Sequence, residues 1–205
     1  EKKDSGGNSQ RKISYELPTD IWTQLSVSRK EGNLTFYVNG VSVGSPIPDD
    51  SVYENSDQLL IGKSEETHFE GFIEQLKIAK TSEYNCNFKP RDFDKFTYPQ
   101  TELCLRLEDN YMNASGCAEV DQINKTDPSL ISTFGNNGSD NVSLTNTPQL
   151  KDDFTIAFQL KLEQPSEPRT ATILHFGDSN SQLTILDLKT ELVTSGQKLV
   201  LSYID

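Results

Sequence analysis

The carboxylates whose spacing could support hydrolysis are Glu65, Glu66, Glu70 and Glu74, the densest acidic cluster that we identify in the chain. Glycoside hydrolysis needs two carboxylates that project from one strand face across a bound sugar. These four residues instead flank an expected loop and the end of an expected strand, which is typical of a solvated charged face. We therefore expect no catalytic carboxylate pair here.

Nucleophilic catalysis is also disfavoured, because the chain has two histidines and neither has a suitable neighbour. His68 lies beside Phe69 in an expected loop, and His175 alternates with Ile173 on an expected strand. Neither has a nearby serine or cysteine in a nucleophile elbow, and the sequence has no glycine-rich phosphate loop. The sequence therefore predicts a protein that is not an enzyme.

Three cysteines, Cys86, Cys104 and Cys117, cannot all pair within one chain. The absence of CxxC spacing and the scarcity of histidines argue against a zinc site. A bridge between Cys104 and Cys117 would close a short loop and is the pairing that we expect, with Cys86 free or paired to another chain. A bridge from Cys86 to either of the other two cysteines remains an alternative.

Five Asn-x-Ser/Thr triplets indicate a secreted or cell-surface protein. They begin at Asn33, Asn113, Asn124, Asn137 and Asn141. All five lie in polar stretches where a glycan would remain solvated. The N-terminal residues 1–4 lack the apolar stretch of a signal peptide, so a signal would lie outside this sequence.

The net charge of −12 restricts the partners of the protein. It repels nucleic-acid phosphates, anionic membranes and other polyanions, heparin included. No apolar run approaches the roughly 20 residues that a membrane helix needs, so we expect no membrane insertion.

Most of the apolar pattern in the sequence is typical of β-strands, so strands are the elements that must position any site. Apolar and polar residues alternate over residues 154–162, which is the period of a strand with one buried face. Residues 33–44 predict a hairpin around Asn39-Gly40. Further short apolar runs occur at residues 25–27, 59–61, 76–78, 103–107, 173–176, 183–185 and 199–203. This pattern predicts an all-β fold, an antiparallel β-sandwich that forms one core.

Two polar stretches lack clear periodicity. Residues 1–12 are expected to form a loop. Residues 110–149 hold four of the five glycosylation triplets. A structureless connection of that length is unusual in a compact domain, so we expect short strands or a turn of helix within it.

The residues around Trp22 resemble a known family. Ile-Trp-Thr-Gln-Leu-Ser-Val at 21–27, followed by Leu-Thr-Phe-Tyr-Val-Asn-Gly at 34–40, is similar to a laminin-G-like segment of the concanavalin-A-like lectin/glucanase superfamily. Residues 60–62 and 69–78 resemble the last strands of that family. The resemblance implies a laminin-G-like jelly-roll sandwich.

The later part of the chain resembles the beginning of the same family. Residues 104–107 are similar to its opening strand, and residues 153–158 and 173–177 to the strands that follow. Residues 1–98 would then be the C-terminal half of a sandwich and residues 99–205 the N-terminal half, together one domain equivalent. Joining Asp205 to Glu1 would restore the usual order of strands.

Three explanations fit this inverted order. The chain could be a circular permutant, a window cut out of phase from a tandem array, or a protomer whose halves complete domains in neighbouring subunits. Termini of sandwiches often lie close together, which favours the first two. We favour packing of both halves within one chain, which predicts that residues 199–203 lie beside residues 13–17.

Calcium is the ligand that the resemblance implies, held at the sandwich rim by oxygen atoms. Asp178 and Asn180 are the best local pair, and Asp49, Asp50 and Asp57 are weaker candidates. The acidic residue that the family has before the next strand is replaced here by Ser181-Gln182. We therefore expect calcium to contribute little and no other cofactor to be bound.

The resemblance implies a recognition or adhesion module that binds an extracellular protein or glycan without catalysis. The alternative is a structural repeat unit of a filament, coat or matrix, whose partners are copies of itself. The superfamily also contains glucanases, but their Glu-x-Asp-x-x-Glu pattern is absent from this sequence. A glycoside hydrolase is therefore the least favoured of the three.

We predict that Asn33 and at least two of Asn113, Asn124, Asn137 and Asn141 carry glycans in protein from its native source, because their contexts resemble exposed turns. Peptide mapping after enzymatic deglycosylation measures the occupancy of each site. Five unmodified asparagines would remove the main argument for secretion.

Overall fold

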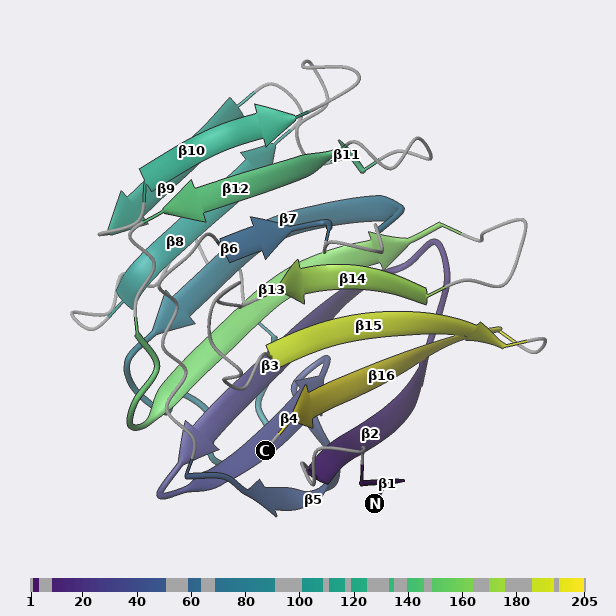
Figure 1. Ribbon diagram of the computed structural model, residues 1–205, viewed down its shortest axis with the longest axis vertical. Helices are drawn as coiled ribbons and strands as arrows, with labels where there is room; N and C mark the ends of the chain where they lie inside the picture. The colour runs from purple at the N-terminus through teal and green to yellow at the C-terminus, as the bar shows by residue number, and fades with distance from the viewer. Residues whose placement is uncertain are drawn as a thin grey trace.

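The computed structural model describes residues 2–3, 9–50, 59–63, 69–90, 101–108, 111–116, 119–124, 133–134, 140–145, 149–163, 170–175, 186–193 and 196–204. These residues form two antiparallel β-sheets, one lying in front of the other in Figure 1. None of them forms a helix that is long and apolar enough to cross a membrane. The predicted fold class, an antiparallel β-sandwich, is confirmed.

Each sheet contains strands from distant parts of the chain. Sheet A has the order β1 (Lys2–Lys3), β2 (Ser9–Leu17), β16 (Gly196–Ile204), β15 (Leu186–Val193), β14 (Thr170–His175), β6 (Leu59–Ile61), β12 (Asn141–Thr145) and β10 (Glu119–Asn124). Sheet B has the order β5 (Val41–Pro48), β4 (Asn33–Val38), β3 (Trp22–Lys30), β13 (Phe154–Leu162), β7 (Gly71–Ala79), β8 (Thr101–Glu108) and β9 (Tyr111–Gly116), and β11 (Thr133–Phe134) also pairs with β7.

The core lies between the two sheets and is made by the inward faces of their central strands. Sheet B contributes every second residue of β3, β4 and β13, and sheet A contributes residues of β6, β12 and β14. The buried side chains include Leu25, Phe36, Leu59, Ile61, Val142, Leu144, Phe154, Ile156, Phe158, Leu160, Ile173 and Leu174. Burying one such side chain contributes about 1.5–3 kcal/mol, so the pairing that buries all of them together is strongly favoured.

Strand β13 is confirmed, but the expectation of a single buried face is wrong for its first half. Its core-facing residues alternate as predicted, yet Thr155 and Ala157 on the outer face are buried as well. The reason is that residues 81–90 lie against its outer face, through hydrogen bonds to Thr155.

The hairpin at Asn39-Gly40 is confirmed. Val38 pairs with Val41 across it, and both turn residues have positive φ, 49° for Asn39 and 77° for Gly40, as a type I′ turn requires. Gly40 is needed for a second reason. A Cβ atom on it would lie 1.9 Å from the carbonyl oxygen of Phe88.

The two ends of the chain are neighbours in sheet A. Strand β16 pairs with β2, Leu199 opposite Tyr15 and Leu201 opposite Ile13, so this prediction is confirmed. The end of β16 lies beside β2 in Figure 1, and β1 follows on the other side of β2. Residues 9–12, expected in a loop, belong to β2, because β16 supplies partners for their backbone. The assignment of residues 1–98 and 99–205 to inverted halves stays a prediction.

The stretch from residue 110 to 149 contains strands, as its length required. Its described parts form β9, β10, β11 and β12, of which β12 lies between β6 and β10. Asn124 and Asn141, two of the glycosylation candidates, face each other across the β10–β12 pair.

A buried ion pair closes one end of the sandwich. Arg29 faces the core side of β3, and its Nη1 donates to Oδ2 of Asp49 at 2.9 Å, with the two side chains 2 % and 0 % exposed. Its Nε donates to the carbonyl oxygen of Asp152 at 2.7 Å. The guanidinium also lies 4.8 Å from the ring centroid of Phe154. The pair thereby ties the end of β5 to the segment before β13.

We predict that Asp49→Ala lowers the free energy of unfolding by about 3–5 kcal/mol, because it leaves the Arg29 guanidinium buried without its counter-charge. The double variant Arg29→Met/Asp49→Leu should recover much of the loss, since it removes both charges. Urea unfolding of the three proteins measures both effects. A single variant within 1 kcal/mol of the natural protein would show that the pair does not hold this end.

Candidate binding site

Residues 81–90, here called the strap, cross the outer face of sheet B. Thr155 on β13 holds one end: its Oγ1 donates to the carbonyl oxygen of Thr81 and accepts from the backbone N–H of Glu83, both at 2.9 Å. Glu83 Oε1 lies 2.6 Å from Lys77 Nζ, and both side chains are buried. These contacts fix the strap on the central strands.

Aromatic rings hold the other end of the strap. Tyr84 and Phe88 stack with centroids 3.7 Å apart, and both contact the ring of Tyr37 on β4. The Tyr37 hydroxyl donates to the carbonyl oxygen of Tyr84 at 3.3 Å, and burial raises the pKa of this hydroxyl. The strap thus seals the half of the outer face that holds Tyr37 and Thr155.

Beyond the strap, three side chains form an aromatic row across the opposite end of the same face. Trp22 on β3, Lys161 on β13 and Phe72 on β7 are opposite one another in register. Lys161 Nζ lies 4.1 Å from the Phe72 ring centroid and 5.7 Å from that of Trp22. The two rings are 6.2 Å apart, and Trp22 is 39 % exposed.

The alternation of β3 explains why Trp22 faces outward. Leu25 and Val27 point into the core, so Trp22 and Gln24 lie on the outer face. An ammonium held over aromatic faces is stabilised by about 0.5–1 kcal/mol at an exposed site, so Lys161 favours the observed positions of both rings. The aromatic row is therefore a partly exposed surface of two rings with an ammonium between them.

A second row of side chains, which can form hydrogen bonds, lies beside the aromatic row, two residues away along each strand. It consists of Gln24 on β3, Gln159 on β13 and Glu74 on β7, which are opposite one another in register. Gln24 is 4 % exposed, and neither its Nε2 nor its Oε1 has a hydrogen-bond partner in the described part of the chain. Leaving a buried polar group unpaired costs about 1–3 kcal/mol, so this amide is an unusual feature.

The backbone at Gln24 is nevertheless well anchored. Its N–H donates to Oδ1 of Asn39, and its carbonyl oxygen accepts from the N–H of Asn39, both at 2.9 Å. The turn that carries Asn39 therefore fixes the main chain of β3 at this row, while the side-chain amide stays unpaired.

Many of the site residues predicted from the sequence lie outside the described residues. They are Asp57, Cys117, Asn137, Asp178 and Asn180. For Cys104, Asn113 and Asn124 the backbone is described, on β8, β9 and β10. Calcium binding at Asp178 and Asn180 and the bridge from Cys104 to Cys117 stay predictions.

The remaining candidates have defined surroundings. Asn33 is exposed beside a turn and its Nδ2 donates to the carbonyl oxygen of Glu31, a setting that accommodates a glycan. Asn141 is 6 % exposed within β12, so a glycan there would disrupt the sheet, and the prediction for this residue has to be corrected. Asp49, a weaker calcium candidate, is bonded to Arg29 instead.

Neither a metal cluster nor a disulfide is present among the described residues. No group of three His, Cys, Asp or Glu side chains gathers there. Cys86 is exposed on the strap with its thiol free. It is the residue that we expect to be free or paired with another chain, and pairing with another chain stays a prediction.

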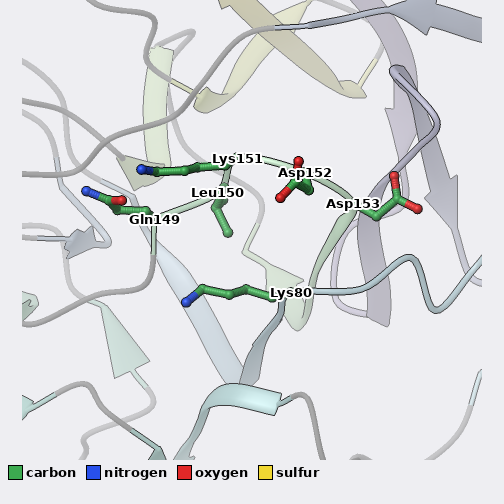
Figure 2. Close-up of a pocket in the computed structure, with 6 residues that line it drawn as sticks. All are labelled: Lys80, Gln149, Leu150, Lys151, Asp152 and Asp153. Carbon is green, nitrogen blue, oxygen red and sulfur yellow. The ribbon is translucent and has the colours of Figure 1, made fainter.

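A pocket of about 290 Å³ lies at the end of the sandwich where Arg29 is buried, and Figure 2 shows the residues that line it. It is lined by Lys80 and by residues 149–153, and Leu150 points toward Lys80. The carbonyl oxygens of Leu150 and Asp152 in its wall accept hydrogen bonds from Arg29. We assign this wall to the structural ion pair rather than to a ligand.

Sequence reasoning missed the aromatic row as a unit. Trp22 drew attention as the start of a strand, but Phe72 and Lys161 lie 50 and more positions away in the chain. The alternation within β3, β7 and β13 shows which residues share a face. Which strands are neighbours, and in which register, does not follow from it.

Comparison with protein families identifies one segment. Residues 2–82, which hold β1 to β7, match the Laminin_G_3 family model, described as the concanavalin A-like lectin/glucanases superfamily. No curated protein and no solved structure matches the chain. The matched segment is thus similar to a laminin-G-like domain of the concanavalin A-like superfamily, and the two antiparallel sheets agree with the sandwich fold that this similarity implies.

Proposed function

We propose that this chain is a non-catalytic recognition module, extracellular or at the cell surface, that binds a protein or glycan through the aromatic row. The observation that carries the proposal is that Trp22 and Phe72 lie side by side on the half of the outer face away from the strap. Laminin-G-like domains generally act in binding rather than catalysis, which agrees with it.

The chemistry of the row suits recognition. Tryptophan and other aromatic side chains dominate binding energy at interfaces, because they combine a large apolar area with few rotatable bonds. Lys161 holds both rings before any ligand arrives, which reduces the entropy lost on binding.

The carboxylates of this face support a role without catalysis. Glu74 is opposite Gln159 in register, and Gln24 follows on the next strand, so this described row pairs a carboxylate with amides. Glycoside hydrolysis requires a second carboxylate at a defined separation across the sugar.

A structural unit of a filament, coat or matrix is the second candidate, and the exposed thiol of Cys86 favours it. The edge of sheet B at β5 argues against growth by strand addition. Asn87 Oδ1 accepts from the N–H of Ser42, and Pro46 and Pro48 have no N–H. Assembly through the Cys86 thiol would be sensitive to reductant, so size-exclusion chromatography with and without reductant tests this second candidate.

We predict that Trp22→Ala and Phe72→Ala each weaken binding at least tenfold, because each removes part of the aromatic surface. The measurement is binding of the purified chain to a panel of immobilised matrix proteins and glycans. Tyr15→Ala is the matched control, since Tyr15 is 40 % exposed but lies on sheet A. Equal loss in all three variants, or in none, would contradict the proposal.

A further inference from the structure

In the described part of the chain, the two sheets end in four edge strands that differ in how well they resist the addition of another strand. Sheet A ends at β1 and β10, and sheet B ends at β5 and β9. An exposed edge presents unpaired N–H and C=O groups, which can pair with another chain. Natural sheets protect such edges with charges, prolines, bulges or very short strands.

Three of the four edges carry such protection. Strand β1 is only two residues long, and both are lysines. Strand β10 contains Glu119 and Asp121, and its register with β12 is interrupted by a shift. The register of β5 with β4 is also interrupted, and β5 contains two prolines, which have no N–H to donate. The N–H of Ser42 on β5 is already bonded to the side chain of Asn87.

Strand β9 has none of these protections. Its sequence, Tyr-Met-Asn-Ala-Ser-Gly at 111–116, contains neither a charged residue nor a proline. It pairs with β8 in an unbroken register, from Tyr111 opposite Glu108 to Gly116 opposite Leu103, and with no other described strand. In an antiparallel pair every second residue directs its N–H and C=O away from the partner strand. Half of the six residues of β9 therefore direct both groups toward the free edge.

The charge around β9 indicates what kind of strand could pair with it. Residues 101–124, which hold β8, β9 and β10, contain five acidic residues and one basic residue. Strands β9 and β10 lie at the same end of the sandwich in Figure 1. A second copy would bring the same acidic strands and a further net charge of −12 to this edge, which is repulsive. A segment that carries Lys or Arg would instead be attracted to it.

We propose that the free edge of β9 is an interaction surface for an extended, basic segment of a partner polypeptide, which adds to sheet B as a further strand. In strand addition, backbone hydrogen bonds provide affinity and the alternating side chains provide specificity. The aromatic row lies on β3, β13 and β7, and β8 separates β7 from β9. The inference therefore does not depend on the proposed recognition function.

The first test measures the binding of labelled six-residue peptides, the length of β9, by fluorescence anisotropy at low ionic strength. Valine alternates in them with lysine, serine or glutamate. We expect the lysine peptide to bind at least tenfold more tightly than the glutamate peptide, with the serine peptide between them. The lysine peptide is also N-methylated at every second residue, in the two possible phases. A strand added to an edge pairs along one side only, so one phase should weaken binding at least tenfold and the other should preserve it.

Two variants locate the binding site. Ser115→Lys places a charge on β9, and Val41→Lys is the matched control, because it adds the same charge to β5 at the opposite edge of sheet B. We expect only Ser115→Lys to weaken binding of the lysine peptide, at least tenfold. Hydrogen exchange of the natural chain needs no variant: the peptide should protect alternate N–H groups of β9 and none of β5. Because the glycosylation candidate Asn113 lies on β9, binding is measured before and after enzymatic deglycosylation.

The outcomes separate this inference from the proposed function. Equal binding of the lysine and glutamate peptides, equal binding of the two N-methylated forms, or no saturable binding before and after deglycosylation overturns the strand addition. Loss of peptide binding in Trp22→Ala overturns the edge site and assigns the peptide to the aromatic row instead. A dimer that forms without peptide and dissociates in Ser115→Lys shows a second copy on the edge, which also overturns the proposal.

Discussion

The register between β3 and β13 is the constraint on which the rest of sheet B depends. It sets Arg29 opposite Phe154 at one end and Trp22 opposite Lys161 at the other. A slip of one residue would turn the core residues Ile156, Phe158 and Leu160 outward and would break both arrangements at once. The same burial that stabilises the sandwich therefore also positions the aromatic row.

The outer face of sheet B is divided between structure and recognition. Under the strap, hydroxyl groups bond one another: Ser28 Oγ lies 3.1 Å from both Ser82 Oγ and Thr155 Oγ1. That half is closed, and these hydroxyl groups are bonded within it. The half with Trp22 keeps a partly exposed ring, a positioned ammonium and an unpaired amide. Groups that cost stability without serving packing are expected where a protein binds something.

The local features of the fold could be predicted from the sequence, because their causes are local. Asn39-Gly40 specifies its turn, and the alternation of residues 154–162 specifies a strand. The pairing of β16 with β2 followed from the need of each half for a partner sheet. The buried outer face at Thr155 was missed, because the strap that covers it comes from a segment more than 70 residues away.

The site was harder to predict than the fold for the same reason. The sequence directed attention to turns rich in Asp and Asn, and Asp49 was taken for a weak metal candidate because its partner, Arg29 on β3, lies 20 positions away in the chain. Asn141 looked like a turn residue but is buried in β12, since β6 and β10 flank that strand. In each case long-range pairing decided what a short motif does.

The emission of the single tryptophan tests the central claim, that ligands bind on the face around Trp22. Trp22 is 39 % exposed, so a ligand that covers its ring should shift the emission to shorter wavelength and protect it from acrylamide quenching. The measurement is a fluorescence titration with any probe whose binding has been established independently. We predict both changes with the same dissociation constant as binding. Saturable binding that leaves emission and quenching unchanged would contradict the account.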